Sequence, residues 1–210
     1  KGPWTTNNSF GRKNGKLDSV LFTDGAFNQK GKSQTYNLNY RLLSDSGKNE
    51  LTVLGTYTPW QRNLLQSFPS TLYDAEGAVI KNLPLYQTRN KGNINIYIAQ
   101  LDYSHQFKKE WSLETGLKHQ QTNSKTLVVY EDYKTGELEI DPSFSNDNNL
   151  KESISGMYGI LTKDWENDKL QMGLRAEISG VNFDGKSKQD KVNFFPTLLY
   201  QHNVNKDLNF

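Results

Sequence analysis

Several segments of the chain alternate between apolar and polar residues, as β-strands with one wet face do. The clearest is 111–118, where Trp111, Leu113 and Leu117 fall on one face and charged or small residues fall on the other. Segments 36–42, 97–103 and 170–178 repeat this pattern, and weaker strand candidates lie at 17–27, 50–59, 152–164 and 191–202. No dozen-residue segment keeps a helical period with caps, so we predict about eight strands and almost no helix.

The alternation also predicts which side chains share a face of the sheet. One face is expected to carry Tyr97, Leu101, Leu113, Leu117, Met172, Leu174 and Ile178. The opposite face is expected to carry Asp102, Glu114, Lys118, Arg175 and Glu177. In a barrel, such charges would line a wet lumen and pair across strands.

The connections between these strands alternate in length. Short polar turns are expected at 44–49, 107–110, 166–169 and 203–207, and longer connections at about 61–92, 123–151 and 183–190. Within 125–141 we expect a hairpin that turns at 134–136. Alternating loop length places the short turns at one end of an up-and-down sheet, as in transmembrane β-barrels. The predicted fold class is therefore all-β, an antiparallel up-and-down meander that forms a barrel or a fragment of a larger transmembrane β-barrel.

Aromatic residues gather at or near the predicted strand ends. They are Tyr57, Trp60, Tyr103, Phe107, Trp111 and Trp165. Girdles of Trp and Tyr mark both interfaces of a barrel that spans lipid. The alternative is that these rings close the core of a small soluble domain.

The composition of the chain excludes several classes of protein. The 210 residues are within the size of one domain, and a net charge of +2 gives no basic field for nucleic acid. The chain has no Cys, which excludes disulfides and thiolate chemistry. Its mean hydropathy is −0.79, yet aromatics reach 12%, which argues against disorder. The chain has no apolar run of about 18 residues, so no transmembrane helix is predicted.

Three stretches of sequence resemble a known family of proteins. The run at 94–118, INIYIAQLDYSHQFKKEWSLETGLK, looks like a hairpin of outer-membrane β-barrel proteins related to TonB-dependent receptors. GLRAE at 173–177 resembles a later strand of that family, and FFPTLLY at 194–200 resembles the next strand. Residues 38–41 and 51–57 are similar to a preceding hairpin, so the resemblance covers roughly 36–210.

The resemblance implies a piece of a larger receptor. Such receptors have a plug, a short segment that contacts TonB, and a barrel of about 22 strands. We expect residues 1–210 to be a single barrel segment without a plug, which stops mid-strand at Phe210. The implied location is the outer membrane of a Gram-negative cell. The implied partners are outer-membrane lipid and the remainder of the barrel and plug, with TonB reached only through parts outside this chain.

Candidate chemistry is sparse. His105, His119 and His202 lie on separate strand segments, so we expect no metal site, and no motif implies a cofactor. The acidic stretch between 131 and 147 lacks the regular spacing of a calcium loop and is interpreted as solvated. Glu114 and Glu177 have no accompanying nucleophile or phosphate loop, so we expect no catalytic residues.

The function that these features favour is nutrient uptake by a non-catalytic receptor barrel. Ligand contact is expected from the long connections, because loops on a rigid scaffold commonly carry binding. The possible ligand-contacting loop residues are Tyr73, Tyr86, Tyr130, Tyr133 and Glu137. The alternative is a soluble secreted or surface β-module that binds carbohydrate or mediates adhesion. Such a module would bury the apolar faces that a lipid-facing barrel leaves exposed.

Overall fold

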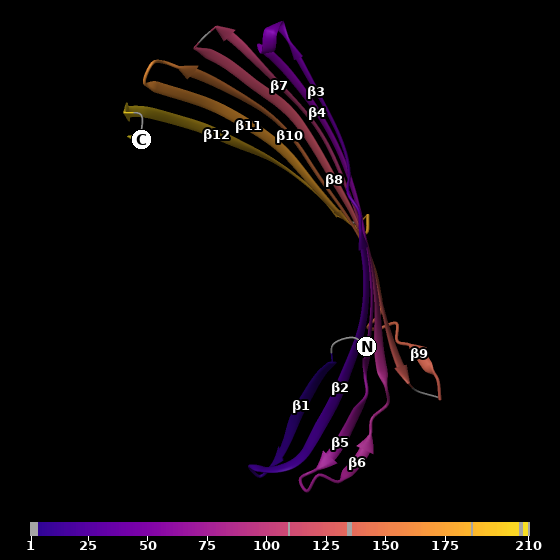
Figure 1. The fold of residues 1–210 in the computed structure, drawn as a ribbon. Coiled ribbons are helices and arrows are strands. Elements are labelled where there is room, and N and C mark those ends of the chain that lie inside the picture. Colours follow the sequence, from indigo (N-terminus) through magenta and orange to yellow (C-terminus); the bar gives the residue numbers. More distant parts are fainter. Residues whose placement is uncertain (1–3, 109, 134–135, 186, 206–207, 210) are drawn as a thin grey trace. The chain divides into compact units, whose positions relative to one another are not determined.

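The computed structural model describes residues 4–108, 110–133, 136–185, 187–205 and 208–209, and nearly all of them are in β-strands (Figure 1). The strands are β1 Trp4–Lys13, β2 Lys16–Ser33, β3 Tyr36–Ser44, β4 Asn49–Phe68, β5 Ser70–Asp74, β6 Val79–Asn82, β7 Tyr86–Lys108, β8 Trp111–Tyr133, β9 Leu138–Ile140, β10 Asn146–Asp164, β11 Asp168–Phe183, β12 Ser187–Asn205 and β13 Leu208–Asn209. One 3-10 turn, Asp45–Gly47, joins β3 to β4. Among these residues no helix has the length and apolarity to cross a membrane.

Each strand pairing for which a register is defined is antiparallel. Hydrogen-bonded neighbours follow the order β13-β12-β11-β10-β8-β7-β4-β2-β5-β6, with β1 on β2, β3 on β4 and β9 on β8. Most neighbours are therefore consecutive long strands, with short hairpins added between them. This arrangement confirms the predicted all-β antiparallel meander.

The chain divides into two compact units, which we describe separately. The first unit comprises residues 1–33, 60–93 and 125–148, and the second comprises 34–59, 94–124 and 149–210. Strands β4, β7, β8 and β10 contribute residues to both units. The single barrel segment expected from the sequence stays a prediction.

The second unit contains three of the four short turns that the sequence predicted; the fourth, at 203–207, lies partly outside the described residues. Strand β3 ends at Ser44 and β4 begins at Asn49, β7 ends at Lys108 and β8 begins at Trp111, and β10 ends at Asp164 before β11 begins at Asp168. Figure 1 shows β4, β7, β8, β10, β11 and β12 side by side in this unit. The tight hairpins keep neighbouring strands in a fixed register, which decides the face on which each side chain lies.

The first unit contains a hairpin that the sequence analysis missed. Strands β1 and β2 pair from Trp4↔Ala26 to Lys13↔Lys16, so only Asn14 and Gly15 form the turn. Both have positive φ, 53° for Asn14 and 78° for Gly15. Asn-Gly favours this two-residue turn because both residues tolerate left-handed backbone. The dipeptide was the signal that could have located β1.

The predicted long connections were wrong in their bounds. Strand β4 continues to Phe68, β7 begins at Tyr86, β8 continues to Tyr133 and β10 begins at Asn146, so most of 61–92 and 123–151 is strand. At 183–190, β11 and β12 are separated by only three residues. The extensions of β7 and β10 are polar on both faces, whereas those of β4 and β8 place apolar residues side by side, as in Leu64-Leu65 and Leu127-Val128-Val129. None of them therefore alternates, and backbone pairing with neighbours holds them in place. The predicted hairpin within 125–141 is confirmed, since β9 pairs with residues 131–133 of β8.

Hydrophobic side chains do not form a buried core in the described residues. Large aliphatic and aromatic side chains of the second unit are exposed instead, including Leu117, Met157, Leu174, Ile178 and Phe194. Six of the seven apolar residues that the alternation placed on one face are exposed, and the seventh, Leu113, is half-buried. This exposure is the result expected for a lipid-facing sheet.

Candidate functional site

The second unit has one aliphatic face, and strand register defines it. Across β10, β11 and β12, Met157 pairs with Ala176, which pairs with Phe194. One pleat further along each strand, Leu174 pairs with Gly159 and with Pro196. We call this surface the aliphatic face; it consists of Leu101, Leu117, Met157, Met172, Leu174, Ala176, Ile178, Val192, Phe194 and Leu198. Leu174 is 53% exposed and Phe194 is 66% exposed, so the face is open to its surroundings.

The opposite face of the same unit carries hydrogen-bonded polar side chains. The hydroxyl of Tyr158 donates to Asp102 Oδ1 at 2.8 Å, and Gln100 Nε2 donates to Asp102 Oδ2 at 2.7 Å. Arg175 forms an ion pair with Glu177 two residues along β11. Lys118 lies beside that pair and lines a small hollow with it. The predicted separation of apolar and charged positions is therefore confirmed for these residues.

Gly116 lets the polar face pack closely. A Cβ at this position would lie 2.5 Å from Tyr158 Cε1 and 2.5 Å from Asp102 Oδ1. The ring of Tyr158 therefore occupies the space that any larger residue would need. Glycine inside a strand commonly marks such a close approach of a large neighbour. In the first unit, Gly92 accommodates the ring of Trp60 in the same way.

Aromatic and basic side chains mark the turn end of the aliphatic face. Lys163 Nζ lies 5.2 Å from the ring centroid of Trp111 and 4.5 Å from that of Trp165, within cation–π range. On the neighbouring strands, Tyr200 donates to Asp168 at 2.6 Å. Tyr103 donates to Asn49 Oδ1 at 3.1 Å. The Trp, Tyr and Lys side chains at this end each have an apolar body and a polar tip, as residues at a membrane–water interface do.

The other end of this face carries a stack of three tyrosines. Tyr36 and Tyr57 have ring centroids 6.1 Å apart, and those of Tyr57 and Tyr97 are 4.9 Å apart. The hydroxyl of Tyr57 donates to Asn95 at 3.0 Å. Aromatic side chains therefore flank the aliphatic face at both ends. Of the predicted girdle residues, Tyr57, Tyr103, Trp111 and Trp165 take these positions, whereas Trp60 packs on Gly92 in the first unit.

The predicted ligand-contacting residues lie in the first unit, but four of them are strand residues and not loop residues. Tyr73 is in β5, Tyr86 is in β7, and Tyr130 and Tyr133 are in β8. Glu137 is exposed in the bend before β9. Tyr86 and Tyr133 line a common hollow of about 350 Å³, whereas Tyr73 lines a different one beside Phe22. The loop assignment was wrong because β7 and β8 continue through this polar region.

Two of these tyrosines belong to a ladder of stacked rings. The centroid distances are 4.8 Å for Phe68–Tyr86, 5.7 Å for Tyr86–Tyr130 and 5.3 Å for Tyr130–Phe144. Stacked or tilted aromatic pairs contribute about 0.5–1.5 kcal/mol beyond their buried area. The ladder therefore stiffens this part of the first unit and fixes the orientation of its tyrosines.

A buried carboxylate lies between β7 and β8, and the sequence analysis treated it as solvated. Glu131 is 7% exposed; its Oε2 accepts from Gln87 Nε2 at 2.6 Å and lies 3.1 Å from Arg89 Nε. A buried charge is stable only when it is paired and hydrogen-bonded, as here. No sequence signal separated Glu131 from the neighbouring acids, because its burial arises from pairing with residues 44 positions away.

The three histidines each have a different partner. His105 contacts Asn49, His119 Nδ1 lies 2.8 Å from Ser155 Oγ, and His202 Nδ1 lies 2.7 Å from Asp168 Oδ1. The described residues contain no group of three or more His, Asp or Glu that could hold a metal ion.

Comparison with known proteins identifies the family. Residues 41–210 match the outer membrane protein beta-barrel family, which is most of the chain and includes all but the start of the second unit. A search of curated proteins found no match. The matched region contains the strands from β4 to β13, the exposed aliphatic face and its flanking aromatic residues other than Tyr36. The chain belongs to the outer membrane protein beta-barrel family, and its place is the outer membrane.

Proposed function

We propose that this chain forms part of the barrel wall of a TonB-dependent receptor that takes up a nutrient across the outer membrane of a Gram-negative cell. The observation that carries the proposal is the two-faced sheet of the second unit. Its exposed aliphatic face suits lipid, and its opposite face holds the Tyr158–Asp102 hydrogen bond and the Arg175–Glu177 ion pair. Alternation between a lipid face and a polar lumen face is the pattern of transmembrane barrels.

The proposed role of the chain is non-catalytic. On the polar face of the second unit Tyr158 of β10 pairs with Asp102 of β7, and Arg175 pairs with Glu177 within β11, as polar residues lining a wet lumen do. In this role the wall needs outer-membrane lipid on one side and the remainder of the barrel and plug to complete it. TonB would act through parts of the receptor outside this chain.

Ligand contact is proposed for the first unit. Tyr86 and Tyr133 line the same hollow, and Tyr130 stacks on Tyr86, which presents amphipathic rings held in fixed orientations. Tyr73 and Glu137 extend this proposed surface to β5 and to the bend before β9. Rigid aromatic side chains bind ligands well because they lose little conformational entropy on binding.

The alternative, a soluble binding module, is less favoured. A soluble domain of this size would bury apolar side chains, yet Leu174 and Ile178 are each more than half exposed. The family match also places the second unit among outer-membrane proteins.

The test of the proposal is growth on limiting nutrients. In the native host we would delete the gene for the full-length receptor, or the gene for TonB, and supply a panel of nutrients too large for diffusion pores. The expected result is that growth on at least one nutrient requires both genes and returns when the receptor is restored. If the full-length protein fractionates with the outer membrane but neither deletion affects growth on any nutrient, the barrel has another role.

A further inference from the structure

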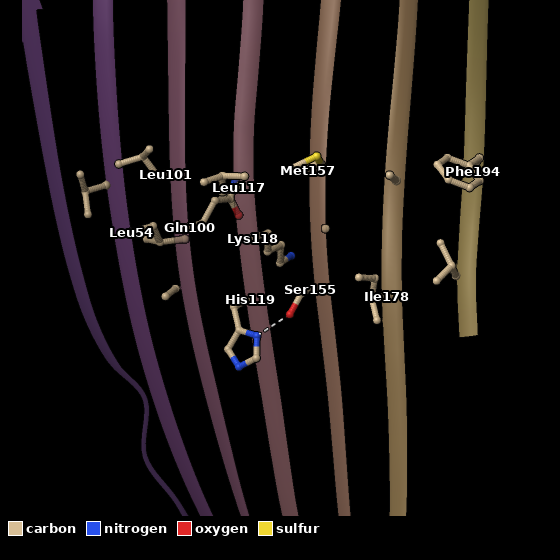
Figure 2. A pocket seen from close by; sticks show the side chains of 15 residues that line it. Leu54, Gln100, Leu101, Leu117, Lys118, His119, Ser155, Met157, Ile178 and Phe194 are labelled. Carbon is tan, nitrogen blue, oxygen red and sulfur yellow. Dashed lines mark hydrogen bonds between the residues drawn. The ribbon is translucent and has the colours of Figure 1, made fainter. Parts of the chain in front are cut away.

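The aliphatic face of the second unit contains a hollow of about 650 Å³ (Figure 2). Its lining is almost wholly apolar and includes Leu101, Leu117, Met157, Ile178 and Phe194. Sites for small molecules typically have volumes of roughly 300–1,000 Å³ and mostly apolar walls. The hollow therefore has the size of a ligand site, although it lies on the face that we assign to lipid.

Alternation of large and small side chains creates this hollow. In one row across the strands, Ala176 lies between Met157 and Phe194. In the next row, Ser155 pairs with Ile178. A small side chain beside a large one leaves a furrow on the sheet surface, because both stand roughly perpendicular to it.

Four polar residues are in the lining, and two of them, His119 and Ser155, belong to the aliphatic face, whereas Gln100 and Lys118 belong to the opposite face. Figure 2 shows the ring of His119 pointing to Ser155, and Nδ1 lies 2.8 Å from Ser155 Oγ. When Ser155 donates to Nδ1, the other ring nitrogen, Nε2, carries the proton and can donate to an oxygen acceptor. His and Ser are costly on a surface that meets hydrocarbon unless their polar atoms have partners. The pair therefore indicates a position where polar lipid atoms reach the sheet.

Neighbouring residues show that the pair lies at one edge of the aliphatic face. Tyr97, of the tyrosine stack, is two residues further from the β7–β8 turn than Ala99, which lines the hollow. On β11, the next position on this face after Ile178 is Gly180. A Cβ at Gly180 would lie 2.7 Å from Asp190 Oδ1, so the carboxylate of Asp190 lies beside this position. The polar and aromatic positions of this edge are those expected at the depth of lipid head groups.

We propose that this hollow is a specific site for one molecule of lipopolysaccharide, the lipid of the outer leaflet. In such barrels the short turns are periplasmic, so the edge with the polar pair, away from the β7–β8 turn, lies on the outer side. An acyl chain lies in the furrow over Ala176, between Met157 and Phe194, and His119 Nε2 donates to an ester or phosphate oxygen of the same lipid. The site rests on the proposed outer-membrane barrel and goes beyond it, because an unspecialised lipid face needs neither the furrow nor the polar pair.

The experiment uses the full-length receptor, purified in detergent, stripped of lipid and titrated with lipopolysaccharide while native mass spectrometry counts bound molecules. We expect one saturable site. His119→Leu, which removes the donor, and Ala176→Leu, which fills the furrow, are each expected to weaken binding at least tenfold. His119→Gln keeps an N–H donor and should retain most of the binding. The matched control is His202→Leu, a hydrogen-bonded His at the turn end, which should change binding less than twofold.

The outcomes distinguish failure of the lipid site from failure of the proposed function. Equal, unsaturable binding in all variants would overturn the site, as would displacement of the lipid by inorganic phosphate, which would indicate an anion site without an acyl furrow. Circular dichroism of each variant checks that the barrel is folded. If nutrient uptake requires the receptor and TonB but lipid binding is unsaturable, only the lipid site fails. If the receptor does not fractionate with the outer membrane, the proposed function fails first.

Discussion

Gly116 lies beneath the ring of Tyr158 and beside the carboxylate of Asp102, where a Cβ would approach both within 2.5 Å. The backbone oxygen of Leu101 would also be only 2.9 Å away, so the neighbours cannot all move aside. We expect Gly116→Val to destabilise the full-length receptor by about 1–3 kcal/mol, the usual range for overpacking. Urea unfolding in detergent micelles measures this. The control is Gly159→Ala, where nothing lies within 4 Å, and a similar loss there would contradict the packing argument.

Leu174 tests which face of the sheet meets lipid. It is 53% exposed in the middle of the aliphatic face, and an Arg at the bilayer midplane of a barrel costs about 2–4 kcal/mol. We expect Leu174→Arg to lower the unfolding free energy by that amount in lipid-reconstituted receptor. The matched variant is Thr197→Arg, because Thr197 pairs with Gly173 on the opposite face of the adjacent strand. Equal effects of the two substitutions would show that the faces do not differ in their surroundings.

At the scale of elements, the sequence predicted those strands whose alternation is set by an apolar face. The hairpins of the second unit are examples, since 97–103 and 170–178 keep a period of two against a hydrophobic environment. The extensions of β4, β7, β8 and β10 could not be predicted in this way. Those of β7 and β10 are polar on both faces, those of β4 and β8 carry adjacent apolar residues, and pairing with neighbouring strands holds them. β1 was missed although Asn14-Gly15 marked its turn.

The β1–β2 turn yields a prediction at the same scale. Gly15 has a φ of 78°, and an L-residue in this region costs about 1–2 kcal/mol. We expect Gly15→Val to speed amide hydrogen exchange in β1 by about 5–30-fold, the equivalent of that free energy. Exchange in β11 should be unchanged. Gly31→Ala, at a strand position with an ordinary φ and 3.6 Å of clearance, is the control. Unchanged exchange in β1 would show that the turn conformation does not limit the stability of this hairpin.

At the scale of the whole molecule, the sequence predicted the separation of lipid-facing and polar residues but not the arrangement of the first unit. The face of Asp102 or Leu174 follows from strand period alone. The partners of Tyr130 do not, because Tyr86 and Phe144 meet it through strand register and chain reversal. For the same reason the five proposed ligand-contacting residues were chosen by residue type. Only the fold shows that Tyr86 and Tyr133 line one hollow and Tyr73 lines another.

The last prediction concerns uptake by the whole receptor. Because Tyr86 lines a hollow with Tyr133 and Tyr130 stacks on it, we expect Tyr86→Ala or Tyr133→Ala to reduce uptake or ligand affinity about tenfold, the equivalent of about 1.4 kcal/mol. Barrel assembly, followed by heat-modifiable migration on gels, should persist because backbone pairing holds β7 and β8. The matched control alters the β7–β8 turn with Glu110→Ala, which should leave uptake unchanged. Shortening the β8–β9 hairpin, which contains Glu137, should also reduce uptake. If both tyrosine variants and the shortened hairpin transport normally, the first unit only connects strands and the ligand binds elsewhere in the receptor.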